Sequence, residues 1–289
     1  MDAINKQSLR QKLHAYKRSP FSFMLFLFVC ISALITVSTL LFLILYILIK
    51  GVPHLTGDLF ALKYTSENGS LVPALVNTIT MTFLSLLIAA PLGIFSAVYL
   101  TEYAKRGNKL VSIVRVTAET LSGIPSIVYG LFGLLFFVTT LGWGYSLLAG
   151  SFTLSIMILP LIMRTTEEAL KSVPDSYRDG SFGLGAGRLR TIFRIILPSA
   201  VPGILAGIIL AIGRIVGETA ALIYTAGTVT QIPPDLLSSG RTLSVHMYAL
   251  SSEGLHIDKA YATAVVLLII VMGINWLSGF IAKKITKGR

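Results

Sequence analysis

One uncharged apolar stretch constrains the fold of this chain more than any other feature. It runs from Phe21 to Ile49 without a charged residue. A helix needs only about 20 apolar residues to cross the roughly 30 Å hydrocarbon core of a bilayer. A secretory signal peptide has an apolar region of about 7 to 15 residues followed by a small-residue cleavage site, and neither condition is met here. We therefore expect residues 21–49 to be a retained transmembrane helix.

The rest of the chain repeats this pattern. Hydrophobic residues make up 54% of the sequence and charged residues 13%, and the mean hydropathy is +0.79. Such a composition is typical of a protein whose solvent is the bilayer. Five further apolar blocks are found at residues 71–101, 113–141, 145–163, 195–226 and 260–282. The sequence predicts an all-α polytopic membrane protein with six transmembrane helices.

The basic residues lie in alternate loops. Nineteen of the 24 Lys and Arg lie in the N-terminal tail, in residues 105–115, in residues 164–194 and in the C-terminal tail. Four lie in the other loops, and the last is Arg214. Cytoplasmic loops of membrane proteins carry an excess of Lys and Arg, so both termini are expected in the cytoplasm. The net charge of +11 is then explained by the basic residues of the cytoplasmic loops, and no nucleic acid partner is expected.

The predicted organisation follows from these blocks. A cytoplasmic tail at 1–20 precedes the first transmembrane helix and an outer loop at 21–70. A core at 71–282 holds five helices and a cytoplasmic loop at 164–194, and a short cytoplasmic tail follows at 283–289. Charges of both signs recur at helical spacing in the cytoplasmic loop, which predicts a short surface helix there.

Proline and glycine interrupt several of the apolar blocks. Proline removes a helical hydrogen bond and kinks a membrane helix where neighbours or a cavity satisfy the backbone. Two interpretations are open: the ordinary enrichment of these residues in membrane helices, or hinges along a pathway. The positions are Pro91-Leu92-Gly93, Gly123-Ile124-Pro125, Pro160 and Pro202-Gly203.

Several kinds of chemistry are not expected in this chain. The single cysteine, Cys30, lies inside the first helix, and the histidines are scattered, so neither a disulfide nor a metal site is predicted. The glycines of Gly183-Leu184-Gly185-Ala186-Gly187 have the wrong spacing for a dinucleotide loop, and the chain has no Walker A pattern. The chain is therefore not expected to be an enzyme or to hold a cofactor, and nucleotide-driven work would need a separate ATPase. The histidines are His14, His54, His246 and His256.

Arg214 lies within the fifth apolar block, where an arginine costs about 2.5 to 3.5 kcal/mol on insertion. Glu218 follows four residues later, so a pair that only eases insertion is one interpretation. The order, with Arg first, is the less stabilising one on a helix. The planar guanidinium suits the oxygens of phosphate or sulfate, which favours a pathway for an anion.

Three other charged residues flank the apolar blocks. Arg164 lies at the cytoplasmic end of the fourth block, where its long side chain could snorkel to the interface or belong to the pathway. Glu119 in the third block has helical spacing to Arg115 and could form a helix-end pair. A proton-coupled carrier that uses Glu119 and Glu218 as titrating sites is an alternative of a different class.

The cytoplasmic loop carries a family pattern. Asp179-Gly180-Ser181 is followed after three residues by Gly185 and after nine more by Ile195-Ile196-Leu197-Pro198. This resembles the EAA loop of bacterial ABC importer permeases, with Asp, Gly and Ser in place of Glu, Ala and Ala. The resemblance implies that the loop is a coupling helix that docks into a groove of a cytoplasmic ATPase. Gly180 should weaken that helix by about 1 kcal/mol relative to alanine. The implied coupling residues are Asp179, Gly180, Ser181, Gly185, Ile195, Leu197 and Pro198.

Further motifs narrow the resemblance to the phosphate-specific Pst permeases. They are Asn77-Thr78 to Pro91-Leu92-Gly93, the stretch 123–130, Arg164-Thr165-Thr166-Glu167-Glu168-Ala169-Leu170, and Gly213-Arg214-Ile215-Val216-Gly217-Glu218-Thr219-Ala220. The modest first outer loop and Arg241-Thr242-Leu243-Ser244-Val245 are most similar to the A-type subunits, PstA.

The resemblance implies a type I ABC importer permease of the bacterial cytoplasmic (inner) membrane that imports inorganic phosphate by alternating access. It implies three protein partners: a homologous PstC-like permease subunit, a PstB-like ATPase dimer that binds ATP and Mg, and a PstS-like extracytoplasmic phosphate-binding protein. It also implies a substrate pathway that contains Arg164, Arg214 and Glu218. A permease for sulfate, molybdate or phosphonate stays open as an alternative.

Overall fold

The computed structural model describes residues 20–105, 107–254 and 256–287 of the chain. The chain divides into two units, residues 1–50 and 51–289. Residues 1–19 of the predicted N-terminal tail and residues 288–289 of the predicted C-terminal tail lie outside the described residues. The described part of the first unit is helix α2 (Pro20–Gly51) up to Lys50, which contains the whole uncharged stretch and has none of its most apolar window buried. An exposed apolar helix of this length suits a surface that faces lipid.

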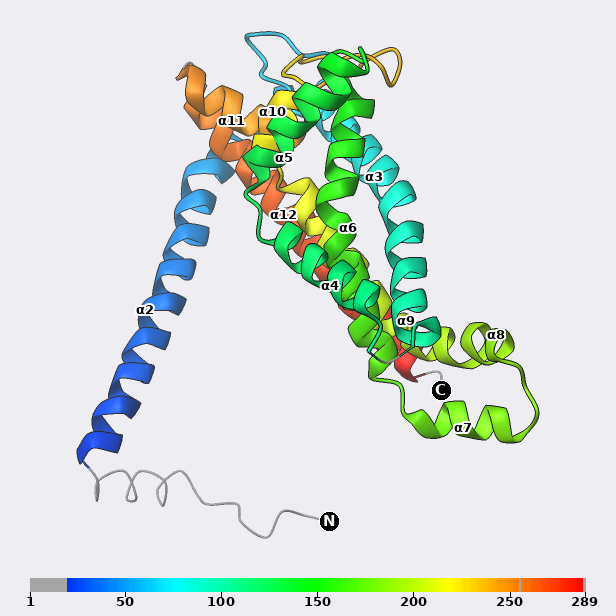
Figure 1. Cartoon of the computed structure of the whole chain (residues 1–289). Helices are drawn as coiled ribbons and strands as arrows, with labels where there is room; N and C mark the ends of the chain where they lie inside the picture. The colour runs from blue at the N-terminus through cyan, green and yellow to red at the C-terminus, as the bar shows by residue number, and fades with distance from the viewer. Residues whose placement is uncertain (1–19, 106, 255, 288–289) are drawn as a thin grey trace. The chain divides into compact units, whose positions relative to one another are not determined.

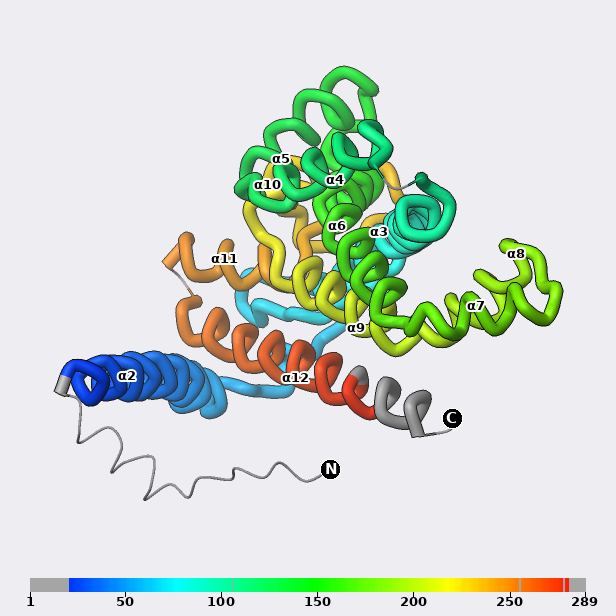
Figure 2. Tube along the Cα trace, turned by 60° about the horizontal axis from the view of Figure 1, so that its bottom comes forward, coloured from blue at the N-terminus to red at the C-terminus, as the bar shows by residue number. Residues whose placement is uncertain are grey.

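The second unit is built around four long helices. These are α3 (Val72–Val98), α6 (Leu147–Lys171), α9 (Leu197–Val216) and α12 (Ile257–Lys287). Helix α6 packs between α3 and α9, and α12 runs along α9 (Figures 1 and 2). The largest buried cluster joins side chains of α3, α6 and α9, among them Met81, Leu154, Ile158 and Ile215.

Shorter elements connect these helices. Two short 3-10 turns, η1 (Val52–His54) and η2 (Gly57–Phe60), precede α3, and π-helical turns η3 (Tyr99–Tyr103), η4 (Leu134–Thr140) and η5 (Ile192–Ile196) extend three of the helices. The remaining helices are α4 (Lys109–Ser122), α5 (Ser126–Gly133), α7 (Asp175–Gly183), α8 (Arg188–Thr191), α10 (Ala220–Thr225) and α11 (Leu243–Glu253).

Small residues let α6 and α9 approach closely. A Cβ on Gly203 would lie 2.6 Å from the Cβ of Ala169, and one on Gly207 would lie 2.0 Å from Oγ1 of Thr165. From the first contact to the second, the residue number rises by four on α9 and falls by four on α6. The two helices run antiparallel, and glycine is required at these two positions by their packing.

The described residues contain five single helices long and apolar enough to cross a membrane, and a sixth crossing if a bent pair counts as one span. The bent pair is α4 with α5 and η4, whose axes differ by 101°. The prediction of an all-α protein with six apolar spans is thus confirmed. Of the four interruptions, only Gly123-Ile124-Pro125 breaks a span, because Pro91, Pro160 and Pro202 lie inside continuous helices.

The loop that the sequence assigns to the cytoplasm, residues 164–194, has other elements than predicted. Residues 164–171 continue α6, so the helical spacing of Arg164, Glu167, Glu168 and Lys171 belongs to the end of a long helix. The separate surface helix begins at Asp175 and ends at Gly183. Figure 1 places α7 and α8 together at one end of the second unit, away from the loops that precede α3 and follow α10.

Candidate functional site

Two broken helices meet inside the second unit. The first break separates α4 from α5 at residues 123–125, and the second separates α9 from α10 at residues 217–219. A Cβ on Gly130 of α5 would lie 2.8 Å from Cα of Ala221 of α10, so the two short helices are in close contact just after their breaks. Non-helical backbone at membrane depth is stable only where protein buries it or a cavity hydrates it, and transporters build binding sites from such breaks.

Arg214 lies in the last turn of α9, beside this junction. It forms no ion pair or hydrogen bond with any residue in the parts of the chain that the structure describes. It lies within electrostatic range of the hydroxyl group of Tyr129 on α5. That hydroxyl group donates a 2.8 Å hydrogen bond to the carbonyl oxygen of Leu121 on α4, across the first break. Arg214 is therefore a charge without an acid partner next to both breaks.

Glu218 does not share a helical face with Arg214, so the expected i, i+4 arrangement is wrong. Helix α9 ends at Val216, and Glu218 lies in the break, 8% exposed. Its Oε1 accepts a 3.1 Å hydrogen bond from the backbone nitrogen of Ala221, in the first turn of α10. The Glu218 carboxylate thus satisfies one of the free N–H groups at that helix start.

Arg164 lies apart from Arg214. Its side chain is 63% exposed on α6, with Nε 3.2 Å from Oε1 of Glu168. The antiparallel register of α6 and α9 puts Arg214 opposite residue 158 of α6. Residue 158 precedes Arg164 by six residues, which correspond to about 9 Å along the helix axis. The structure therefore places the two predicted pathway arginines at different depths of the molecule, with Arg164 nearer the cytoplasmic loop.

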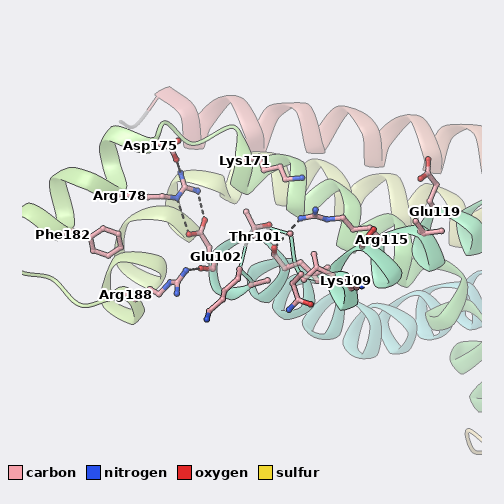
Figure 3. Close-up of a pocket in the computed structure, with 18 residues that line it drawn as sticks. Thr101, Glu102, Lys109, Arg115, Glu119, Lys171, Asp175, Arg178, Phe182 and Arg188 are labelled. Atoms are coloured by element: carbon pink, nitrogen blue, oxygen red, sulfur yellow. Dashed lines mark hydrogen bonds and ion pairs between the residues drawn. The ribbon is translucent and has the colours of Figure 1, made fainter.

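A large cavity opens at the end of the second unit that carries α7 and α8 (Figure 3). Its volume is about 1330 Å³, and it is formed by η3, the start of α4, the end of α6 and helices α7 and α8. Cationic side chains outnumber acidic ones on its wall. The cations are Lys105, Lys109, Arg115, Lys171, Arg178 and Arg188, and the acids are Glu102, Glu119 and Asp175. Two of the basic segments that the sequence assigns to the cytoplasm meet here.

Arg115 does not form the expected pair with Glu119. Its Nη2 lies 2.7 Å from Oε1 of Glu167 on α6, and Nζ of Lys171 lies 2.6 Å from the same oxygen. Both contacts are ion pairs rather than aligned hydrogen bonds. Glu167 is nearly buried, and its pair with Arg115 joins α4 to the end of α6. Tertiary packing decides this pairing, and helical spacing on α4 alone could not predict it.

The predicted coupling residues Asp179, Gly180 and Ser181 lie on α7. The hydroxyl groups of Ser181 and Thr191 are 2.8 Å apart and buried, which joins α7 to α8. Gly185 follows with a φ of +79°, a left-handed conformation that favours glycine. Leu184 beside it is 91% exposed, so the turn presents an apolar side chain to its surroundings.

The second half of the coupling pattern points inward. Ile195 and Leu197 pack against a buried cluster that includes Ala169, Leu170 and Ile196. Pro198 lies in the first turn of α9, where proline is well tolerated. These apolar residues anchor the segment to the helical core, while α7 and the Gly185 turn form its exposed side.

The sequence did not reveal the contact that fixes α7 to the core. Arg178 Nη2 and Nε lie 2.6 Å and 3.3 Å from the two carboxylate oxygens of Glu102 on η3. Nη1 of Arg178 donates to the carbonyl oxygen of Val173 and to Asp175, and Nη2 also donates to the carbonyl oxygen of Leu170. Figure 3 shows Arg178 between Glu102 and Asp175. The hydrogen bond from Arg178 to Glu102 raises the pKa of Arg178 above its ordinary value. The partners are 76 positions apart, and no local pattern links them.

Arg188 adds a second contact to the same acidic residue. It donates a hydrogen bond to the carbonyl oxygen of Glu102, and its guanidinium lies 5.3 Å from the centre of the Tyr103 ring. Both short helices, α7 and α8, are therefore attached to η3, the extension of α3.

Comparison with known proteins gives a consistent result. Residues 89–287 match the family described as "Binding-protein-dependent transport system inner membrane component". The chain is 36% identical over 263 residues to the "Probable ABC transporter permease protein YqgI" of Bacillus subtilis, covering 83% of this chain and 89% of that protein. It is 34% identical over 261 residues to the "Phosphate transport system permease protein PstA 2" of Mycobacterium bovis, covering 86% of each.

Solved structures share the fold at low sequence identity. A chain of the bacterial alginate ABC transporter in complex with its pentasaccharide-bound periplasmic protein aligns with a TM-score of 0.68 at 18% identity, covering 94% of this chain and 98% of that one. At that identity the likeness concerns the fold of the permease and leaves the cargo open.

Proposed function

Because the chain belongs to the family of binding-protein-dependent transport system inner membrane components, we propose that it carries inorganic phosphate into the cytoplasm with energy from a partner ATPase. An ABC importer permease is a multi-pass inner-membrane protein and a transport subunit rather than an enzyme. Beyond the family, we propose a cargo, an energy source, and the residues that bind the cargo or contact the ATPase.

An unpaired arginine beside two broken helices is the observation that carries the cargo proposal. Arg214 has no acid partner in the described parts of the chain. Burying an ionised group at that depth costs free energy, so its presence indicates a functional role. An oxyanion would neutralise the charge and accept hydrogen bonds from the planar fork of the guanidinium. The likeness to proteins named PstA favours phosphate among the oxyanions.

The proposed pathway continues from Arg214 toward the cytoplasmic cavity. Arg164 lies nearer that cavity, and the excess of cationic side chains on the cavity wall would attract an anion that has left Arg214. Glu218 takes part by holding the first turn of α10 at the second break. We assign Arg164, Arg214 and Glu218 to this pathway.

The proposed energy source is a separate ATPase dimer that binds ATP and Mg and contacts the permease at α7 and the Gly185 turn. The exposed Leu184, next to the left-handed Gly185, would enter an apolar groove of that partner. A homologous permease subunit and an extracytoplasmic phosphate-binding protein complete the proposed assembly. A proton-coupled carrier is disfavoured because it would have no use for such a segment.

We also propose that both termini and the α7–α8 segment face the cytoplasm, as the distribution of basic residues predicts. In a Cys30→Ala background, a cysteine at Ser66 should react with an impermeant maleimide in intact cells. A cysteine at Lys105 should react only after permeabilisation. Both side chains are exposed, so access to the reagent depends on the side of the membrane. Labelling of position 105 in intact cells would show that the orientation is the opposite of the proposed one.

Uptake by the reconstituted complex tests the proposed function. Proteoliposomes that contain this chain, its partner permease and the ATPase should accumulate labelled phosphate when the binding protein and ATP are supplied. Accumulation that follows a proton gradient without ATP would favour the carrier alternative instead.

A further inference from the structure

Arg241 is a second arginine whose burial needs a reason. It lies just before α11, at the end of the second unit opposite α7 and α8, and is 3% exposed. Its backbone nitrogen donates a 2.9 Å hydrogen bond to Val229, and its carbonyl oxygen accepts a 3.2 Å hydrogen bond from Nδ2 of Asn77 on α3. The backbone at Arg241 is thus fixed between α3 and the loop that follows α10.

One edge of the Arg241 guanidinium is unused. Nε and Nη2 are buried and make no hydrogen bond within the described parts of the chain. None of the carboxylates described there forms an ion pair with Arg241. Nε and Nη2 lie on the same edge of the planar group, the edge whose two parallel N–H bonds match two oxygens of a carboxylate or an oxyanion. The unused donors therefore form a complete bidentate site.

The face of the guanidinium has a partner, but the edge does not. Its central carbon lies 4.7 Å from the centre of the Tyr64 ring, a cation–π contact. Such a contact uses the π face and leaves every N–H bond free. Because the cation–π attraction is smaller than the cost of burying an ionised group, the contact with Tyr64 alone does not compensate for the burial of the Arg241 charge.

His246 extends the same cluster. It is fully buried, its ring meets the Tyr64 ring edge-on at 6.0 Å, and neither nitrogen makes a hydrogen bond of normal geometry with a described residue. Burial and, second, the Arg241 charge lower the pKa of His246 to about 3, and a contact with the Gly69 backbone acts in the opposite direction. His246 is therefore neutral at physiological pH and keeps one N–H donor.

The cluster is connected to the broken-helix junction. Ser244, three residues after Arg241, donates a hydrogen bond to the carbonyl oxygen of Glu218. A change in the loop at Arg241 can therefore reach the break between α9 and α10 through a single side chain.

We propose that Arg241, assisted by His246, forms a site for a small oxyanion at the outer end of the permease, separate from Arg214, which phosphate occupies when the outer loops open. The proposal rests on the proposed function, because the cargo must be an oxyanion. In this structure the large cavity is at the cytoplasmic end and the Arg241 edge is buried, as expected when the outer end is closed. In the alternate state the edge would meet phosphate before Arg214 does.

Chemical modification of individual arginines tests this site. The assembled transporter in lipid nanodiscs is treated with phenylglyoxal, with and without a non-hydrolysable ATP analogue, and modification is quantified at each arginine by peptide mass spectrometry. Inorganic phosphate is compared with chloride at equal ionic strength. The measurement is repeated in an Arg214→Gln complex, and the exposed Arg190 serves as the internal control.

Arg241 should be unreactive in the closed state and reactive in one nucleotide state. Phosphate at about ten times its dissociation constant should slow that reaction about tenfold, since only the unoccupied fraction reacts. Protection should persist in Arg214→Gln, and Arg190 should react equally in all conditions. An Arg241 that reacts in neither state, or that phosphate does not protect, would overturn the site.

The outcome separates this inference from the proposed function. If the wild-type complex imports phosphate but Arg241 is not protected, the outer site is wrong and the function stands. If Arg241 is protected but no phosphate is imported, the proposed function fails and the outer site stands.

Discussion

Replacing Arg214 with glutamine is expected to abolish phosphate uptake while the protein remains inserted and bound to its ATPase. Glutamine is polar and of similar length, but it carries no charge and lacks the bidentate fork. Glu218 bonds to the backbone of α10 rather than to Arg214, so the change leaves no acid stranded and abundance should be normal. Uptake of labelled phosphate and co-purification of the ATPase are measured together.

Two matched variants sharpen this test. Arg214→Lys keeps the charge and loses the fork, so it should retain part of the uptake if charge dominates. Arg194→Gln removes an exposed arginine near the start of the same span and should leave uptake within about twofold of wild type, as for surface sites in general. Uptake by Arg214→Gln above about a tenth of wild type, a loss of under ~1.4 kcal/mol, would remove Arg214 from the pathway.

Replacing Arg178 with glutamine is expected to detach the cytoplasmic loop from the core. Glu102 would be left nearly buried without its cation, and breaking a buried pair in this way costs about 3 to 5 kcal/mol. Arg178 also donates to two carbonyl oxygens that would lose their donors. Transport and ATPase co-purification should both fall strongly, and the segment around α7 should become more sensitive to protease.

The double change Arg178→Gln with Glu102→Gln separates the charge from the contact. It removes the stranded charge, so part of the stability lost in Arg178→Gln should be regained, whereas coupling should stay impaired because two amides do not reproduce the bidentate geometry. Arg190→Gln, an exposed arginine on α8, is the matched control and should behave as wild type. Full coupling in Arg178→Gln would mean that the hydroxyl contact between Ser181 and Thr191 suffices to hold α7.

The sequence was sufficient for the features that depend on local composition. The apolar blocks predicted the six spans because a membrane helix needs an apolar run of fixed length. The break at Gly123-Ile124-Pro125 was among the four predicted interruptions, but nothing local separated it from Pro91, Pro160 or Pro202. The difference is tertiary: α6 and α9 remain continuous where they pack against each other, whereas α5 turns aside to meet α10.

The pairings of charged residues could not be predicted, because each depends on contacts between distant segments. Helical spacing suggested Arg115 with Glu119 and Arg214 with Glu218. The fold instead joins Arg115 to Glu167 and uses Glu218 at the start of α10. Arg178 with Glu102 and the cluster around Arg241 unite residues many positions apart, so neither leaves a signal in any short window of sequence.

Uptake in proteoliposomes of defined composition tests the central claim most directly. Labelled phosphate is supplied with the binding protein, ATP is present or absent inside or outside the vesicles, and unlabelled arsenate, sulfate and molybdate compete in parallel. The account predicts accumulation only when the ATPase can reach ATP, with competition by arsenate, which has the charge and shape of phosphate, and little by sulfate or molybdate. Accumulation without ATP, or uptake of sulfate or molybdate in preference to phosphate, would contradict it.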